Sequence, residues 1–266
     1  MTIIAWLRDA STTLADHLIP SARLDAEIIL AHTINRPRTW LHAHGDDTLD
    51  PRRMEIANAR VRLRLDYTPI AYIIGHKEFY GRRFYVTPST LIPRPESEAL
   101  INLLKKRMKK SYKTCIDVGA GSGCLGITAK LEYPKLNVTL SDVDRHALHV
   151  AERNANACHA TVETIVNSLL PPGSVYDIII ANLPYVDKTW YRNEETNFEP
   201  GRALFAPDGG LALIKKLINQ TKRGLAPGGL LLLEADPRQH GAVTDYATKH
   251  NLSLVASEGY ALAFTR

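Results

Sequence analysis

The chain has 266 residues, of which 45% are hydrophobic and 23% are charged. These proportions are typical of an ordinary globular protein, and the length suggests one large domain beside a small one. No apolar run is long enough to span a bilayer, and the N-terminus lacks the basic start and long apolar core of a signal peptide. We therefore expect neither a membrane segment nor secretion.

Positive charge is concentrated in one segment. The net charge is +5, and between residues 99 and 116 cationic side chains occur without any acid, namely Lys105, Lys106, Arg107, Lys109, Lys110 and Lys113. The rest of the chain is close to neutral. We interpret this basic segment as a helix end favoured by the helix dipole. An RNA-facing patch is the alternative interpretation.

Cysteine and histidine usage predicts neither a disulfide nor a metal site. Cys115, Cys124 and Cys158 form no C-x-x-C pair, so we expect reduced thiols in a cytoplasmic protein. His42 and His44 lie in a loop rich in Gly and Asp. We expect these imidazoles to be solvated and not to bind metal.

The first seventy residues carry helical patterns. Ser21 can cap a helix over residues 22–33, and Asp50-Pro51 is typical of a cap followed by a first helical turn. Amphipathic helices of this size bury little surface alone. We therefore expect a small helical bundle over residues 1–70.

Residues 71–90 are predicted to connect this bundle to a larger domain over residues 91–266. Apolar and aromatic runs occupy residues 70–74, 79–81 and 83–86. They indicate a β-rich region that begins just before the connector. Gly81, which lies between aromatic runs, suggests a β-hairpin.

Apolar strands alternate with helical patterns from residue 114 onward. The strand candidates are residues 115–118, 136–141, 162–166, 177–181, 230–234, 252–256 and 261–265. Pro227-Gly228-Gly229 marks a turn before the fifth candidate. The last two are joined by a link too short for a helical crossover, so they should be antiparallel. We expect an α/β fold with a doubly wound, mostly parallel, seven-stranded Rossmann-like sheet.

The first of these strands runs into a glycine-rich loop. Gly119, Gly121 and Gly123 let the backbone approach a ligand closely, and the helix that follows begins with free N–H groups. The segment from Gly121 to Gly126 matches the dinucleotide pattern G-x-G-x-x-G. The overlapping pattern D-x-G-x-G-x-G, which starts at Asp117, resembles S-adenosylmethionine-dependent methyltransferases.

Asp142 ends the second strand candidate, about 20 residues past the glycines, where an acid can accept both hydroxyls of a ribose. NAD and S-adenosylmethionine both carry such a ribose, so Asp142 does not distinguish them. Asp144 is a competing candidate, which we interpret as the N-cap of a helix over residues 145–155.

Asn182, Leu183, Pro184 and Tyr185 follow the strand candidate that ends at Ala181. Ligands bind to α/β sheets in loops of this kind. The Asn182 amide oxygen and the Leu183 carbonyl are two acceptors, Pro184 stiffens the loop, and Tyr185 offers a face for stacking. Taken alone, the tetrapeptide is compatible with an ordinary turn. Together with the glycine loop it indicates a methyltransferase that acts on a planar NH₂ group.

These segments together resemble the release-factor glutamine methyltransferases (the PrmC/HemK family). The similar blocks are residues 21–32, 69–86, 91–98, 117–123, 199–204 and 234–239. The resemblance implies a class I methyltransferase fold and S-adenosyl-L-methionine as cofactor, with S-adenosyl-L-homocysteine as product. It also implies that the substrate is the glutamine of the Gly-Gly-Gln motif in class-1 peptide chain release factors, and that the helical bundle docks this partner. We expect a monomer.

The resemblance also implies the site residues. The predicted catalytic residues are Asn182, Leu183, Pro184 and Tyr185. The predicted cofactor-binding residues are Asp117, Gly119, Ala120, Gly121, Ser122, Gly123, Asp142, Leu169 and Asn182.

Two positions depart from the family pattern. Leu183 stands where the family usually has proline, and Asn-Leu-Pro-Tyr is similar to ribosomal RNA adenine dimethyltransferases. Ser168 and Leu169 replace an acid and an aromatic residue, which implies a weaker or purely apolar adenine contact. The alternative functions are an exocyclic-amine methyltransferase acting on RNA or DNA, and a binding module with a decayed site.

Overall fold

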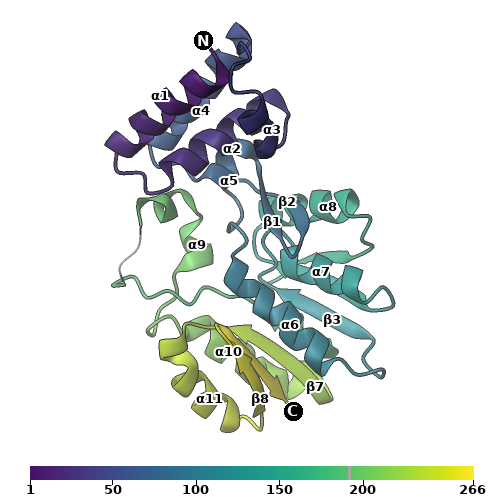
Figure 1. Cartoon of the computed structure of the whole chain (residues 1–266). Helices are drawn as coiled ribbons and strands as arrows, with labels where there is room; N and C mark the ends of the chain where they lie inside the picture. Colours follow the sequence, from purple (N-terminus) through teal and green to yellow (C-terminus); the bar gives the residue numbers. More distant parts are fainter. Residues whose placement is uncertain (191–192) are drawn as a thin grey trace. The chain divides into compact units, whose positions relative to one another are not determined.

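The computed structural model describes residues 1–190 and 193–266 (Figure 1). The chain forms two compact units. One consists of residues 1–75 together with 193–198, and the other contains the rest of the described chain. None of the described helices is long and apolar enough to cross a membrane.

The first unit is a helical bundle. Its helices are α1 (Ile3–Asp16), α2 (Ala22–Ile34), α3 (Arg38–Ala43), α4 (Pro51–Leu65) and α5 (Ile70–Ile74), with the 3-10 turn η2 (Glu194–Phe198). Their apolar faces form one core around Leu14, Ile29 and Leu30, which are fully buried. Asp50 caps α4 as predicted, because its side chain accepts from the Arg53 N–H.

Two sequence predictions for this unit are wrong. Ser21 occupies the N-cap position of α2, but its hydroxyl donates to Asp25 Oδ2 (2.8 Å) and caps no backbone N–H. The run Ile70–Ile74, predicted as β-structure, is the short helix α5. Five apolar residues carry no decisive periodicity, whereas Pro69 before them and the left-handed Gly75 after them are helix start and stop signals.

A buried arginine joins distant segments within this unit. Arg64 is only 1% exposed, and its Nε donates to Asp25 Oδ2 (2.7 Å). Its Nη2 donates to Glu195, which lies in η2. Residues 193–198 are thereby attached to the bundle although they follow β6 and the tetrapeptide Asn182–Tyr185 in the chain.

The second unit begins with the predicted hairpin, β1 (His76–Phe79) and β2 (Arg82–Tyr85). Tyr80 and Gly81 form its turn with φ of 51° and 69°, the left-handed pair that suits a two-residue hairpin. After η1 (Pro95–Ser97) and α6 (Glu98–Arg107) the chain enters the main sheet.

The main sheet has seven strands in the order β5-β4-β3-β6-β7-β9-β8. They are β3 (Thr114–Val118), β4 (Asn137–Asp142), β5 (Glu163–Val166), β6 (Tyr176–Ala181), β7 (Leu225–Glu234), β8 (Ser253–Glu258) and β9 (Ala261–Thr265). The first five pair in parallel, and β9 is antiparallel to both neighbours. The predicted doubly wound topology is therefore confirmed.

Pro227-Gly228-Gly229 does not precede the fifth strand as a turn but lies within β7. Tyr176 pairs with Leu225 and Ile178 with Leu230, so four residues of β7 bulge out between these two pairs. The left-handed Gly228, with φ of 71°, provides the backbone freedom that such a bulge requires.

Helices cover both faces of the sheet. They are α6, α7 (Cys124–Glu132) and α8 (Arg145–Ala157) on one face, and α10 (Ala212–Gly224) and α11 (His240–Thr248) on the other (Figure 1). The short α9 (Gly201–Leu204) and η3 (Pro237–Gln239) belong to connecting segments. Ile178 and Ile180 pack in the core with α6, α7 and α8, whereas Ile179 packs in the core with α10 and α11. This alternation along β6 is the period of a strand buried on both faces.

Most of the basic segment pairs with the protein's own acids and carbonyls. Lys105 pairs with Glu132 on α7, and Lys106 pairs with Glu258 on β8. Arg107 and Lys109 donate to backbone carbonyls. These contacts support our interpretation of the segment as a helix end that fastens α6 to its own domain.

Candidate active site

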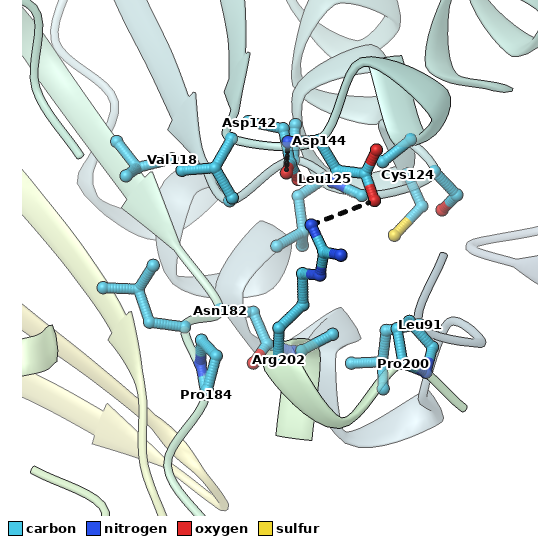
Figure 2. Close-up of a pocket in the computed structure, with 18 of the residues that line it drawn as sticks. Leu91, Val118, Cys124, Leu125, Asp142, Asp144, Asn182, Pro184, Pro200 and Arg202 are labelled. Carbon is cyan, nitrogen blue, oxygen red and sulfur yellow. Dashed lines mark hydrogen bonds and ion pairs between the residues drawn. The ribbon is translucent and has the colours of Figure 1, made fainter. Parts of the chain in front are cut away.

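A pocket opens at the carboxyl ends of β3, β4 and β6 (Figure 2). It is lined by the glycine loop, by Asp142 and Asp144, by the loop after β5 and by the loop after β6. Residues 91–94 and Ser97 contribute another part of the lining, and Pro200, Arg202 and Ala203 close the remaining side. The carboxyl edge of a parallel sheet is where this fold class binds ligands.

The glycine loop is fixed to β4 by backbone hydrogen bonds. The N–H groups of Gly119 and Ala120 both donate to the Ser141 carbonyl, at 2.8 and 3.0 Å. Gly119 has φ of 72°, and a Cβ there would lie 3.1 Å from Leu183 Cδ2. The loop therefore packs directly against the tetrapeptide, and Gly119, Ala120, Gly121 and Ser122 line the pocket.

Asp142 and Asp144 have different roles in the pocket. Asp142 Oδ2 accepts from the Gly121 N–H and Oδ1 from the Asp144 N–H, both at 2.9 Å. Each oxygen retains a second acceptor position, which a ligand hydroxyl can use. Asp144 caps α8 as predicted by accepting from His146 N, and its Oδ2 lies 3.5 Å from Arg202 Nη1 across the pocket (Figure 2).

Asp117 and Gly123, both predicted to bind the cofactor, are not among the pocket-lining residues. Asp117 is 1% exposed, and its Oδ2 accepts from the Gly126 N–H (2.8 Å) at the start of α7. Burial, with a smaller contribution from the charge of Asp142, raises the pKa of this carboxyl to about 7. Gly123 is needed for packing, because a Cβ there would lie 2.8 Å from Ile127 Cδ1.

The loop after β5 places Leu169 against the pocket in a strained conformation. Leu169 has φ of 63°, which is uncommon for a residue other than glycine. Its carbonyl accepts from Ser141 Oγ (3.4 Å) and from Asn167 Nδ2 (3.3 Å). Backbone strain of this kind gathers at ligand sites, and the apolar Leu169 side chain is available there for an apolar contact.

The first half of the tetrapeptide, Asn182 and Leu183, lines the pocket. Asn182 Nδ2 donates to Ser97 Oγ (2.9 Å), so the Asn182 amide oxygen remains available. The Leu183 side chain is buried in the core with α10 and α11. Within residues 1–190 and 193–266 no peptide bond is cis, so Pro184 keeps the trans geometry.

Tyr185, in the second half of the tetrapeptide, is fixed by hydrogen bonds to residues outside the pocket lining. Tyr185 does not line the pocket, and its phenol donates to Glu234 Oε1 (3.0 Å). Its carbonyl accepts from Gln239 Nε2 (2.8 Å). Gly210 packs so closely that a Cβ there would lie 1.9 Å from the same carbonyl.

Several residues that build this site are not predicted from the sequence. They are Ser97, Glu199, Glu234 and Gln239. Glu199 is buried, accepts from the Ile92 N–H (3.0 Å) and pairs with Arg94. The only sequence signal was their membership of the blocks at 91–98, 199–204 and 234–239, which the fold brings together around the tetrapeptide.

The pocket offers no thiolate nucleophile. Cys124 lines it, but burial and the neighbouring Asp117 raise the pKa of its thiol to about 12. Among the described residues, no group of three His, Cys, Asp or Glu side chains could hold a metal ion. What the site provides is a set of oriented acceptors beside a glycine loop.

Comparisons with known proteins agree with this geometry. A family model described as the PrmC N-terminal domain matches residues 5–75, and one described as the Methyltransferase small domain matches residues 95–244. The T. thermophilus 16S rRNA N2 G1207 methyltransferase, solved with AdoMet and guanosine, shares the fold, with a TM-score of 0.52 and 18% identity over 72% of this chain and 49% of that chain.

Curated relatives match over most of their length. The release factor glutamine methyltransferase of Koribacter versatilis is 38% identical over 232 residues, which cover 82% of each chain. The enzyme of the same name from Escherichia coli is 33% identical over 247 residues, which cover 90% of this chain and 87% of the relative. The chain therefore belongs to the release factor glutamine methyltransferase family.

Proposed function

We propose that the protein transfers the methyl group of S-adenosyl-L-methionine to the side-chain amide nitrogen of the glutamine in the Gly-Gly-Gln motif of class-1 peptide chain release factors. One observation carries this proposal beyond family membership. Ser97 holds the NH₂ end of Asn182, which leaves the Asn182 amide oxygen as an acceptor beside the glycine loop, and the carbonyl of the pocket-lining Leu183 is the proposed second acceptor. Two acceptors in this arrangement fit the two N–H bonds of a primary amide.

The cofactor would lie along the glycine loop. Gly119 to Gly121 provide close backbone approach for its methionine and ribose part, and Asp142 offers its remaining acceptor positions to the ribose hydroxyls. Leu169 provides an apolar surface for the adenine ring. Asp117 contributes indirectly, by fastening the start of α7 behind the loop.

The chemistry requires positioning more than acid–base catalysis. S-adenosylmethionine supplies an electrophilic methyl group on a sulfonium, and the reaction leaves S-adenosylhomocysteine. An amide nitrogen is a poor nucleophile because its lone pair is delocalised, and holding it in line can supply about 7–11 kcal/mol of the barrier. The Asn182 and Leu183 oxygens accept the two N–H bonds and stabilise the positive charge that develops on nitrogen. The proton leaves to water after the new C–N bond has formed.

The helical unit is proposed to dock the release factor. Its support is the match of residues 5–75 to a separate family domain and its position outside every pocket-lining segment. A chain shortened to begin at His76 should bind cofactor and methylate a short Gly-Gly-Gln peptide, but it should methylate intact release factor poorly. A full rate on intact release factor would exclude a docking role. The active protein is proposed to be a monomer.

The test of the overall function is mass spectrometry of a purified release factor after incubation with this protein and cofactor. We expect one added methyl group on the glutamine and none on a factor whose Gly-Gly-Gln is changed to Gly-Gly-Ala. Incorporation of radiolabelled methyl into ribosomal RNA, with none into the release factor, would instead favour the RNA amino-methyltransferase suggested by Leu183.

A further inference from the structure

Gln239, the last residue of η3, has a buried side-chain amide that bonds to the backbone of three segments. The residue is only 5% exposed and is not among the described residues that line the pocket. Its Nε2 donates to the Tyr185 carbonyl (2.8 Å) and to the Gly209 carbonyl (2.7 Å), and its Oε1 accepts from the Asp236 N–H (3.1 Å). A buried amide that is satisfied in this way holds its partners rigidly.

The three partners fix which end of the amide faces which segment. The Tyr185 and Gly209 carbonyls only accept, so they require the NH₂ end. The Asp236 N–H only donates, so it requires the oxygen. A flipped amide would place an oxygen against two carbonyls and an NH₂ group against an N–H. The backbone therefore determines an orientation that the shape of the side chain alone would leave open.

The two carbonyls belong to segments that build opposite parts of the pocket wall. Tyr185 directly follows the pocket-lining part of the tetrapeptide, and Gly209 follows the pocket-lining Ala203 within one continuous segment. The Val186 N–H donates to the Leu204 carbonyl (3.0 Å), so the two segments also contact each other directly. The buried amide therefore fixes the tetrapeptide relative to the segment that follows α9.

Tyr185 has little freedom to move between these contacts. Its phenol donates to Glu234 Oε1 (3.0 Å), and a Cβ on Gly210 would lie 1.9 Å from its carbonyl oxygen. The ring of Pro184 fixes one backbone dihedral, so few rotations separate the Tyr185 peptide from the Leu183 carbonyl. A displacement of the Tyr185 carbonyl would therefore change the direction of the Leu183 carbonyl.

From these contacts we infer that Gln239 is a positioning residue for methyl transfer. Its amide fixes the Tyr185 carbonyl and, through Pro184, the direction of the Leu183 carbonyl, without touching cofactor or substrate. Loss of its two N–H donors should slow the transfer step, because misplaced contacts forfeit catalysis by orientation. This inference rests on the proposed function, because it assumes that the Leu183 carbonyl accepts from the substrate amide.

The decisive variant is Gln239→Glu, which keeps the shape and the acceptor for the Asp236 N–H. Its carboxylate places an oxygen against two carbonyls and donates to neither. At neutral pH we expect single-turnover methylation of release factor, at saturating cofactor and substrate, to fall roughly ten- to hundredfold. Affinity for S-adenosylmethionine, measured by calorimetry, should change by less than about twofold, because Gln239 lies outside the pocket lining.

The pH dependence of Gln239→Glu separates positioning from a general loss of structure. A neutral glutamic acid regains one donor, while its other oxygen still accepts from the Asp236 N–H. Burial raises the pKa of a carboxyl, so the ratio of variant to wild-type turnover should rise at least about fivefold from about pH 8 to about pH 5.5. The ratio cancels the titration of groups that both proteins share. A variant that is merely less stable would bind less cofactor, but each cofactor-bound molecule would turn over at the wild-type rate.

Gln220→Glu is the matched control for this change. Gln220, on α10, uses its side-chain oxygen, which accepts from the Leu170 N–H (2.9 Å) in the loop after β5. A glutamate retains this acceptor. Turnover should therefore stay within about twofold of the wild type, and its ratio to the wild type should not depend on pH.

Gln239→Met tests the same contacts without introducing a titratable group. It keeps the approximate length of the side chain but removes both donors, so it should be about as slow as Gln239→Glu at neutral pH, with no recovery at low pH. Wild-type turnover by cofactor-bound Gln239→Glu, or by Gln239→Met if Gln239→Glu does not fold, would overturn the inference, and so would a Gln239→Glu ratio that does not rise on acidification. A wild-type enzyme that leaves release factor unmethylated would instead refute the proposed function itself.

Discussion

The two loops that meet in the pocket are held in different ways, although they follow neighbouring strands. Val118 of β3 pairs with Ala181 of β6, so the loops leave the sheet side by side. The glycine loop is fixed mainly through its own N–H groups, those of Gly119 and Ala120 on the Ser141 carbonyl and that of Gly121 on the Asp142 carboxylate. The tetrapeptide is fixed by the side chains of Ser97, Glu234 and Gln239. Apart from Asp142, the cofactor half of the site should therefore tolerate side-chain changes nearby better than the substrate half.

The largest expected effect concerns the substrate half. Asn182→Ala removes one preorganised transition-state contact, which typically costs about 2.7–4 kcal/mol, or roughly a hundred- to thousandfold in rate. Cofactor affinity should stay nearly constant, because the glycine loop does not depend on this side chain. Single-turnover kinetics and calorimetry test both statements, and an almost fully active Asn182→Ala would show that the amide is bound elsewhere.

Asp142→Ala tests the cofactor half. It removes acceptors for the ribose and also frees the N–H groups of Gly121 and Asp144, and each lost bond to a charged group costs about 1.5–3 kcal/mol. We expect weaker cofactor binding by calorimetry, with turnover at saturating cofactor much less affected than in Asn182→Ala. Asp144→Ala is the matched control. If it weakened binding more than Asp142→Ala, Asp144 would be the ribose ligand.

Asp117→Asn tests whether the acid behind the glycine loop affects stability. Burial raises its pKa to about 7, so between pH 4 and 7 the folded chain holds a proton that the unfolded chain has released. The free energy of unfolding is therefore highest at low pH. It falls as the pH rises through that window, by up to about 1.4 kcal/mol per pH unit.

The asparagine keeps an acceptor for the Gly126 N–H and removes this dependence. Urea denaturation across the same pH range should give a flatter profile for the variant than for the wild type. Parallel profiles would mean that Asp117 does not titrate in this window.

The smallest effect is expected for Leu183→Pro, which restores the residue that is usual in the family. The carbonyl acceptor is retained and the loop becomes stiffer, so methylation of release factor should change by less than about threefold, or under 1 kcal/mol. The buried Leu183 side chain contributes packing to the core, so thermal unfolding should be measured in parallel. A large loss of turnover at unchanged stability would indicate that Leu183 itself shapes the substrate pocket.

The sequence predicted the parts of this molecule that depend on local patterns. The seven strands and the hairpin at Gly81 follow from short-range periodicity and glycine placement, and they are confirmed. Ile70–Ile74 was misassigned because five apolar residues fit either a helix or a strand. The sequence predicts a turn at Pro227-Gly228-Gly229, where the structure has a bulge, because turns and bulges are both rich in proline and glycine.

The supporting residues of the site could not be predicted in the same way. Asn182 and Ser97 are 85 residues apart, and Tyr185 and Glu234 are 49 residues apart. Hydrogen bonds between such distant side chains leave no periodic trace in one sequence. The resemblance identified the segments that carry Ser97 and Glu234, but the direction of their hydrogen bonds emerges only from the folded chain.

Residues 193–198 are attached to the helical bundle through the contact between Arg64 and Glu195. This contact limits how the bundle can be exchanged between related proteins. A chimera joined near residue 75, with the first part of one relative and the remainder of another, would separate Arg64 from its native partner. Arg64 is almost fully buried, so an unmatched neighbour at position 195 would leave part of its charge uncompensated. Functional exchange of this unit therefore needs two grafts, one at the N-terminus and one inside the methyltransferase half of the chain.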